Sequence, residues 1–375
     1  MSHSKSSEEL ADNIESVSSP ETLSIWGLAW PSILANILFA AAGVVSIKAV
    51  GVLGTEAVAA VGTGQRILFV IQSIIMAVST GTAALVARAF GSGNYKEASQ
   101  VLLDSLWIGS VLSLLASLSM WFYGESIISF FGLDPESKKL AVIYIKYTML
   151  FSITFSCSFI FSSALRAAGD AKTPLAIMIF QNLLNIYLLI GLVNGQFGFP
   201  KLGVLGASYA WGISFTAGTI IYLILWLSKK TIIPVPDIRG IIYERVKSII
   251  RIATPATLES GVFQSGLLFY FWIISLYGTA PSAAYNIGIN ILMLSFMIGQ
   301  GFSIAGATLT GQFLGANNPR EAKRSGWRSA GLSIISMGFV GLLIAVFSND
   351  ISRFLVDDDE AVSYTHLTLP TNREV

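Results

Sequence analysis

The sequence has little charge, a single cysteine and two histidines. Only 12% of its 375 residues are charged, which is about half the share of a soluble domain. Cys157 alone cannot form an internal disulfide or a cysteine metal cluster. The histidines, His3 and His366, are isolated, and no Gly-rich loop ends in the Gly-Lys-Ser/Thr signature that binds nucleotide phosphates. We therefore expect no enzyme and no cofactor, and the net charge of +1 argues against a nucleic-acid partner.

Apolar segments make up most of what is present, since 53% of the residues are hydrophobic. Segments of about 20 apolar residues can cross a bilayer, and only helices satisfy their own backbone there. A soluble protein with a large buried core is the alternative, but its helices would need charged faces that these segments lack. The sequence predicts nine spans, at residues 24–49, 57–89, 101–123, 140–165, 174–193, 204–227, 249–276, 283–314 and 330–347.

Lysine and arginine concentrate in the connections that follow the even-numbered spans. These connections are residues 91–98, 166–173, 228–248 and 315–327, and they lie on one side of the membrane if the spans alternate in direction. Basic connections stay in the cytoplasm. We therefore expect a multi-pass protein of the inner (cytoplasmic) membrane with a cytoplasmic N-terminus.

The sequence also contains an internal repeat. Gly54 and Gly278 are 224 residues apart, and the same offset matches Pro31 with Pro255 and Asn94 with Asn318 without a gap. Six spans separate the copies, so both copies enter the membrane in the same direction. Such parallel repeats are related by an axis along the membrane normal, and substrates bind between them.

These features divide the chain into five parts. Residues 1–22 are polar, lack the features of a signal peptide and are expected to form a disordered leader. Residues 23–228 form an N-lobe of six spans, and residues 229–248, with Pro234 and Pro236, form a cytoplasmic inter-lobe loop. Residues 249–360 form a partial C-lobe of three spans. Residues 361–375 are treated separately below.

Several short motifs together carry a family resemblance. They are Ala29-Trp30-Pro31, Leu53-Gly54-Thr55-Glu56-Ala57, Gly81-Thr82-Ala83-Ala84, Gly91-Ser92-Gly93-Asn94, Arg166-Ala167-Ala168-Gly169-Asp170, Asn182-Leu183-Leu184-Asn185-Ile186 and Gly203-Val204-Leu205-Gly206-Ala207. In this combination the chain resembles the multidrug and toxin extrusion (MATE) family. The resemblance implies an all-α fold of the MATE/MOP-superfamily type, with twelve helices in two six-helix lobes. It also implies an antiporter that exports drug-like, metabolite or cationic small molecules by alternating access, coupled to Na⁺ or H⁺, and we expect it to be monomeric.

Two other functions remain open at this stage. A lipid-linked oligosaccharide flippase of the same superfamily would carry several cations in its central cleft, and mid-span cations are few here. A non-transporting membrane scaffold is the second alternative, and the parallel repeat argues against it.

The acids that many family members carry in the first lobe are missing. Ser46 stands at the first of these positions and Leu189 at the second. Glu259, a few residues inside the seventh span, is the remaining candidate for ion or proton coupling, since an ionisable residue in a span usually has a function. A structural hydrogen bond is the alternative role for Glu259, and the coupling acid would then lie in the part of the protein expected beyond residue 360. Asp104 opens the third span, and we interpret it as a solvated helix end.

Uncharged polar and aromatic residues in the spans are candidates for the substrate cleft. The residues Asn182 and Asn185, and likewise Asn286 and Asn290, share a helix face because of their spacing. Hydrogen bonds between helices are the alternative role for such side chains. The full set of cleft candidates is Gln181, Asn182, Asn185, Gln264, Tyr270, Asn286 and Asn290.

The end of the chain differs from the rest. The DNA string GTCTCTTATACACATCTGACGCTGCCGACG encodes residues 362–371 and is the read-through of a transposase-based sequencing adapter. Residues 372–375 fit its index and continuation. We interpret residues 361–375 as adapter-derived and expect the natural protein to continue beyond residue 360, because nine spans fall short of the implied twelve.

Overall fold

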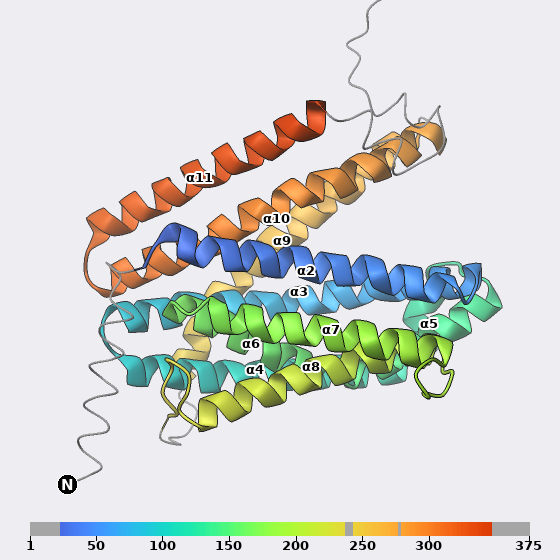
Figure 1. The fold of residues 1–375 in the computed structure, drawn as a ribbon, viewed down its shortest axis with the longest axis horizontal. Coiled ribbons are helices and arrows are strands. Elements are labelled where there is room, and N and C mark those ends of the chain that lie inside the picture. Colours follow the sequence, from blue (N-terminus) through green and yellow to red (C-terminus); the bar gives the residue numbers. More distant parts are fainter. Residues whose placement is uncertain (1–22, 237–242, 277–278, 347–375) are drawn as a thin grey trace, which may run out of the picture.

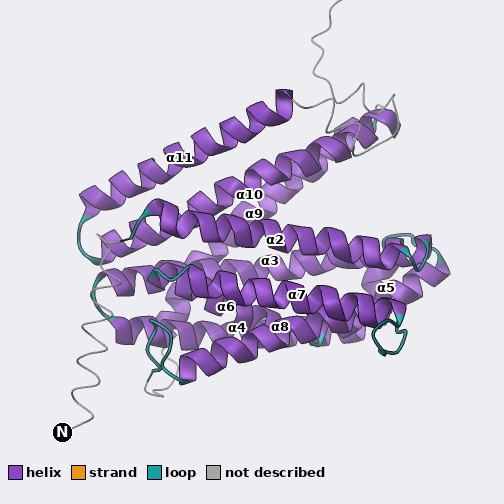
Figure 2. Cartoon of the chain, viewed as in Figure 1, coloured by secondary structure: helices purple, strands orange, loops and turns teal. Residues whose placement is uncertain are grey.

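The computed structural model describes residues 23–236, 243–276 and 279–346. Every regular element within these ranges is an α-helix (Figure 2). The helices are α2 (Ile25–Gly51), α3 (Thr55–Gly91), α4 (Tyr95–Ser129), α5 (Pro135–Met149), α6 (Ser152–Ala168), α7 (Lys172–Asn194), α8 (Val204–Leu227), α9 (Tyr243–Ser275), α10 (Thr279–Gly315) and α11 (Pro319–Val346).

The prediction of an all-α polytopic membrane protein is confirmed. Six helices are long and apolar enough to span a membrane, and a seventh span results if the bent pair α5–α6 counts as one. Within the described residues, α9 and α10 form helices at the predicted seventh and eighth spans but do not meet the same criterion. Most helices extend beyond the predicted spans, because amphipathic turns continue outside the apolar segments.

The predicted fourth span, residues 140–165, is broken. Helices α5 and α6 meet at an angle of 53° around Leu150 and Phe151. The Thr148 hydroxyl donates to Tyr144 O at 2.6 Å, and such bonds to the preceding turn bend helices. The Phe151 ring occupies the space that a side chain at Gly212 of α8 would fill, so packing fixes the bend.

The internal repeat is visible in the helix boundaries. Helices α3 and α10 begin 224 residues apart and end 224 residues apart, and α4 and α11 begin at the same offset. The matched residues Asn94 and Asn318 both accept at the N-terminus of a helix, from the backbone N–H of Glu97 and of Glu321. Both contacts satisfy a backbone donor that the helix leaves free.

The two lobes contact each other through helices that match one another in the repeat. The repeat matches α2 with α9 and α3 with α10. Helix α2 of the N-lobe packs against α10, and α3 packs against α9, so each of these two contacts is the copy of the other. Helices α3 and α10 also cross each other. A Cβ at Gly91 would overlap Gln312 O, and a Cβ at Gly315 would overlap Arg88 O, again the matched pair. The contact therefore has the reciprocity of a two-fold axis.

One end of the bundle holds the connections α3–α4, α6–α7 and α10–α11, the end of α8, the start of α9 and the start of α2 (Figure 1). We call this the basic end, because it holds the connections rich in lysine and arginine. Figure 1 shows that α10 lies close to α2 at this end and leans away from it toward the other end. The predicted loop 229–248 is too long, since residues 243–248 already belong to α9.

Candidate functional site

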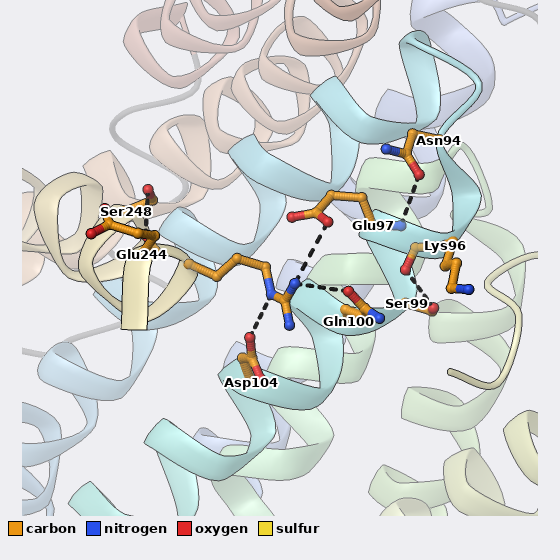
Figure 3. Close-up of polar contacts among 9 residues, drawn as sticks. Asn94, Lys96, Glu97, Ser99, Gln100, Asp104, Glu244 and Ser248 are labelled. Atoms are coloured by element: carbon orange, nitrogen blue, oxygen red, sulfur yellow. Dashed lines mark hydrogen bonds and ion pairs between the residues drawn. The ribbon is translucent and has the colours of Figure 1, made fainter. Parts of the chain in front are cut away.

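A cluster of charged and polar side chains joins the two lobes at the basic end. Arg245, in the first turn of α9, donates from Nε to Asp104 Oδ2 at 2.7 Å and from Nη1 to Gln100 Oε1 at 2.7 Å. Glu97 Oε2 lies 3.7 Å from the same Nη1. Figure 3 shows Glu97, Gln100 and Asp104 along one side of α4, facing the guanidinium from α9. The cluster therefore ties the start of the C-lobe to the third helix of the N-lobe.

The interpretation of Asp104 as a solvated helix end is wrong. Its side chain is 2% exposed, and that of Arg245 is 11% exposed. The misinterpretation arose because Asp104 was placed at the start of the third span, whereas α4 begins more than two turns earlier, at Tyr95. Because a buried carboxylate is costly without a partner, the pair with Arg245 is what allows Asp104 to lie there.

A cavity of about 210 Å³ adjoins this cluster. Its wall includes Arg245, Glu97 and Ser248, together with Arg88 and Ser92 from the end of α3. Polar groups with this much space can bind water. The Arg245–Glu97 side of the cluster is thus accessible to water, whereas Asp104 is enclosed.

A second polar contact between the lobes lies at the end of α6. The buried side chain of Gln312 on α10 donates from Nε2 to Ala167 O at 2.8 Å. Carbonyls in the last turn of a helix have no partner within the helix, so Gln312 satisfies one of them. Thr308, one turn earlier on α10, lies 3.4 Å from Arg166 O.

Glu259 lies on α9 and is exposed, with Gln264 half-buried and Tyr270 exposed further along the same helix. The three residues therefore belong to one helix of the C-lobe. Glu259 lies at the middle of α9, and Gln264 and Tyr270 lie on the half that leads away from the basic end. The coupling role of Glu259 and the cleft roles of Gln264 and Tyr270 stay predictions.

The other cleft candidates of the N-lobe lie on α7. Gln181 is buried and donates from Nε2 to Ser158 Oγ of α6 at 3.0 Å, which is a hydrogen bond between helices of one lobe. Asn182 and Asn185 are half-buried, and the Asn182 Nδ2 is enclosed without a hydrogen-bond partner. Asn286 and Asn290 belong to α10, but their side chains lie outside the described residues.

The two positions where acids were expected have different surroundings. Leu189 is 1% exposed and belongs to the hydrophobic core of the N-lobe, with Leu192 and Ile145. Ser46 is half-buried on α2. This chain therefore has a buried leucine in the core of the N-lobe where the resemblance implied an acid.

The described residues thus form two lobes that meet at one end of a membrane-embedded bundle, which is the architecture of a transporter. The chain matches the MatE family over residues 31–190 and 255–371, and it belongs to this family. Since the family is one of transporters, the chain is a multi-pass membrane transporter and not an enzyme. The second matched segment ends within residues 361–375, whose adapter origin stays a prediction and which lie outside the described residues.

Relatives and solved structures agree with this assignment. The chain is 31% identical over 354 residues to the probable multidrug resistance protein NorM of Thermotoga maritima, covering 91% of this chain and 73% of the relative. It is 27% identical to the probable multidrug resistance protein YoeA of Bacillus subtilis, covering 90% and 74%. An outward-facing multidrug resistance MATE family transporter of the MOP superfamily has the same fold, with a TM-score of 0.85 and 20% identity over 94% of this chain and 80% of that one.

Sequence reasoning missed Arg245 and Gln312 as contacts between the lobes. A signal for the first existed, because Glu97, Gln100 and Asp104 are spaced by three and four residues and so share one helix face. A charged stripe at the edge of an apolar span needs a cationic partner. Gln312 carries no such signal, since its partner is a backbone carbonyl.

Proposed function

We propose that this chain is a secondary active efflux transporter that exports drug-like or metabolite small molecules, some of them cationic, by alternating access between its lobes. Two relatives named as probable multidrug resistance proteins support this substrate class. We propose further that it acts as a monomer in the inner membrane with the basic end in the cytoplasm, as the distribution of lysine and arginine favours.

One observation carries the proposal: the lobes are joined at the basic end and lean apart beyond it. Close contacts join them there, where a Cβ at Gly81 on α3 would lie 2.8 Å from Ile249 O and one at Gly301 would lie 3.1 Å from Ala29 O. Further from the basic end, Asn36 Nδ2 donates to Met297 O at 3.5 Å. Figure 1 shows α10 leaning away from α2 beyond it. This arrangement supports a state that is closed to the cytoplasm.

Side chains on the outer half of α9 are consistent with an open side. Large apolar residues there are exposed, among them Phe263, Phe269 and Trp272. Such side chains can contact drug-like molecules or lipid, and aromatic rings also attract cations. We propose that those facing α2 and α3 line the route of the substrate, with Gln264 and Tyr270.

We propose that Glu259 binds the coupling ion, either H⁺ or Na⁺. Its place at the middle of α9, next to the half with Gln264 and Tyr270, supports the proposal, since an ion there could compete with substrate. Ser46 and Leu189 stand where acids were expected, so these positions offer no carboxylate for the ion. Asp104 is also an acid in a predicted span, but it is paired with Arg245. Glu259 is therefore the candidate that we propose.

A transport assay tests the proposal. The complete gene is expressed in bacteria that lack their own drug exporters, and the efflux of a fluorescent cationic dye is followed with and without Na⁺ and proton gradients. We expect faster efflux than in cells with an empty vector, and the difference should disappear when the coupling gradient is removed. Equal dye accumulation in both strains, across a panel of dyes, would count against an exporter.

A further inference from the structure

We propose that Arg245 and Asp104 form a latch between the lobes, which holds the basic end closed and separates whenever that end opens. The proposal rests on the alternating access proposed above and adds the residues that stabilise one of its two states. It assigns a role to a buried ion pair that the substrate route and the coupling site do not use.

The latch lies beside a close helix contact. One turn after Arg245, the Ile249 backbone packs against Gly81 of α3, where a Cβ would lie 2.8 Å from Ile249 O. Arg245 therefore reaches α4 while the adjacent turn of α9 is pressed against α3. This geometry clamps the start of the C-lobe onto two helices of the N-lobe, so α9 cannot move away from the N-lobe without breaking the ion pair.

The guanidinium has a second carboxylate on the path outward. Asp104 is enclosed at 2% exposure, whereas the Glu97 side chain, two turns nearer the basic end of α4, is 40% exposed. The cavity beside them lets water reach Arg245 and Glu97. As α9 moves outward, Arg245 can pass from Asp104 toward Glu97, which lowers the cost of separating a buried pair. An ion pair that never separates would not need Glu97 as a second partner for Arg245.

The acceptor positions of the latch change charge in the C-lobe. At the repeat offset, the positions that match Gln100 and Asp104 are Arg324 and Arg328 on α11, and both are exposed. The acceptors of the N-lobe thus become cations in the C-lobe. The position that matches Arg245 is Glu21, which lies outside the described residues, so the described part of the chain shows this pair for the Arg245 copy alone.

An accessibility experiment measures whether the pair holds the lobes together. Cys157→Ser removes the single cysteine, and Ala305→Cys adds a reporter on α10 that is fully buried against Leu28 and Ala29 of α2. The reporter lies between the lobes but is not part of the latch. Inside-out vesicles from cells expressing the complete gene are treated with a membrane-impermeant thiol reagent, and the rate of labelling is measured.

Variants of the latch are compared in this background. We expect Asp104→Asn and Arg245→Gln to raise the labelling rate at least about fivefold, as a lost coupling between two states does. Arg245→Lys keeps the charge and should stay close to the parent rate. Glu125→Gln is the matched control, because Glu125 forms an exposed 3.5 Å ion pair with Lys138 within the N-lobe. The amount of each variant in the membrane is measured alongside.

A wedge variant separates failure of the latch from failure of the proposed transport movement. Gly81→Leu forces α3 away from α9 while both residues of the ion pair stay in the sequence, so it parts the lobes without removing either charge. If this variant speeds labelling while Asp104→Asn and Arg245→Gln label at the parent rate, the latch is overturned and alternating access stands. If none of the three changes the rate, the lobes do not part at this end, and both proposals fall.

Discussion

Gln312 of α10 completes the end of a helix in the other lobe, with its Nε2 donating to Ala167 O of α6 at 2.8 Å. The side chain is fully buried, so no solvent can replace it. The contact gives the first prediction about how the lobes are held together.

We expect Gln312→Ala to lower the stability of the folded protein by about 1–3 kcal/mol, because it leaves a buried carbonyl without a donor. The thermal unfolding midpoint of the purified protein in detergent measures the loss. Gln300→Ala is the control, since Gln300 lies on the same helix but is exposed. Equal midpoints for the two variants would show that the contact contributes nothing.

The crossing of α3 and α10 depends on glycine at Gly315. A Cβ there would overlap the backbone of Arg88, so we expect Gly315→Ala to push the helices apart and cost about 1–3 kcal/mol. Gly331→Ala provides a matched control on α11, because nothing lies within 4 Å of a Cβ at that position. It should stabilise its helix by about 0.5–1 kcal/mol instead. Unfolding midpoints that shift in the same direction for both variants would contradict this prediction.

Replacement of Glu259 tests ion coupling directly. We expect Glu259→Gln to remove the dependence of dye efflux on the ion gradient, because the amide can neither exchange a proton nor bind Na⁺ as a carboxylate does. Glu56→Gln, at the start of α3, changes an exposed acid at the far end of the bundle and should leave efflux as it was. Efflux by Glu259→Gln with parental pH and Na⁺ dependence would exclude Glu259 from the mechanism.

Asp134 gives a prediction about pH. Hydrogen bonding from Ser137, whose backbone N–H donates to Oδ2 at 3.0 Å, lowers the pKa of Asp134 below its usual 3.8 at the start of α5. The stabilisation of this helix start is therefore present above pH 3.8 and is lost as the pH falls through the lowered pKa. We expect deuterium uptake of residues 134–140, relative to Asp134→Asn, to rise only below pH 3.8. Uptake that follows the Asn variant at every pH would contradict a role for the charge.

The number and order of the long helices could be predicted, since apolar length marks them in the sequence, but several of their ends could not: α4 begins at Tyr95 and α11 at Pro319, well before the predicted spans. The repeat offset even gave the matched ends of α3 and α10. The bend at Leu150 and Phe151 could not be predicted, because no proline or glycine marks it and the contact with Gly212 comes from a distant helix. Local patterns carry no information about such contacts.

The candidate site was harder to predict for the same reason. Asp104 looked like a solvated end until its partner, 141 residues away, was known. Gln181 was expected among the cleft candidates, and its bond to Ser158 shows the alternative role that buried amides often have. Glu259 could be chosen from sequence because an acid in a membrane span is rare, whatever its neighbours.

The reciprocal contact of Gly91 with α10 and of Gly315 with α3 has a further consequence. Each copy of the repeat contacts the other through the same positions, because Gly91 and Gly315 match and so do Arg88 and Gln312. Such an interface is called isologous and is typical of two-fold homodimers. Each half of this chain therefore carries a surface complementary to itself. Because both halves are joined in one chain, this contact forms within a single molecule and does not depend on the concentration of the protein, as it would in a homodimer.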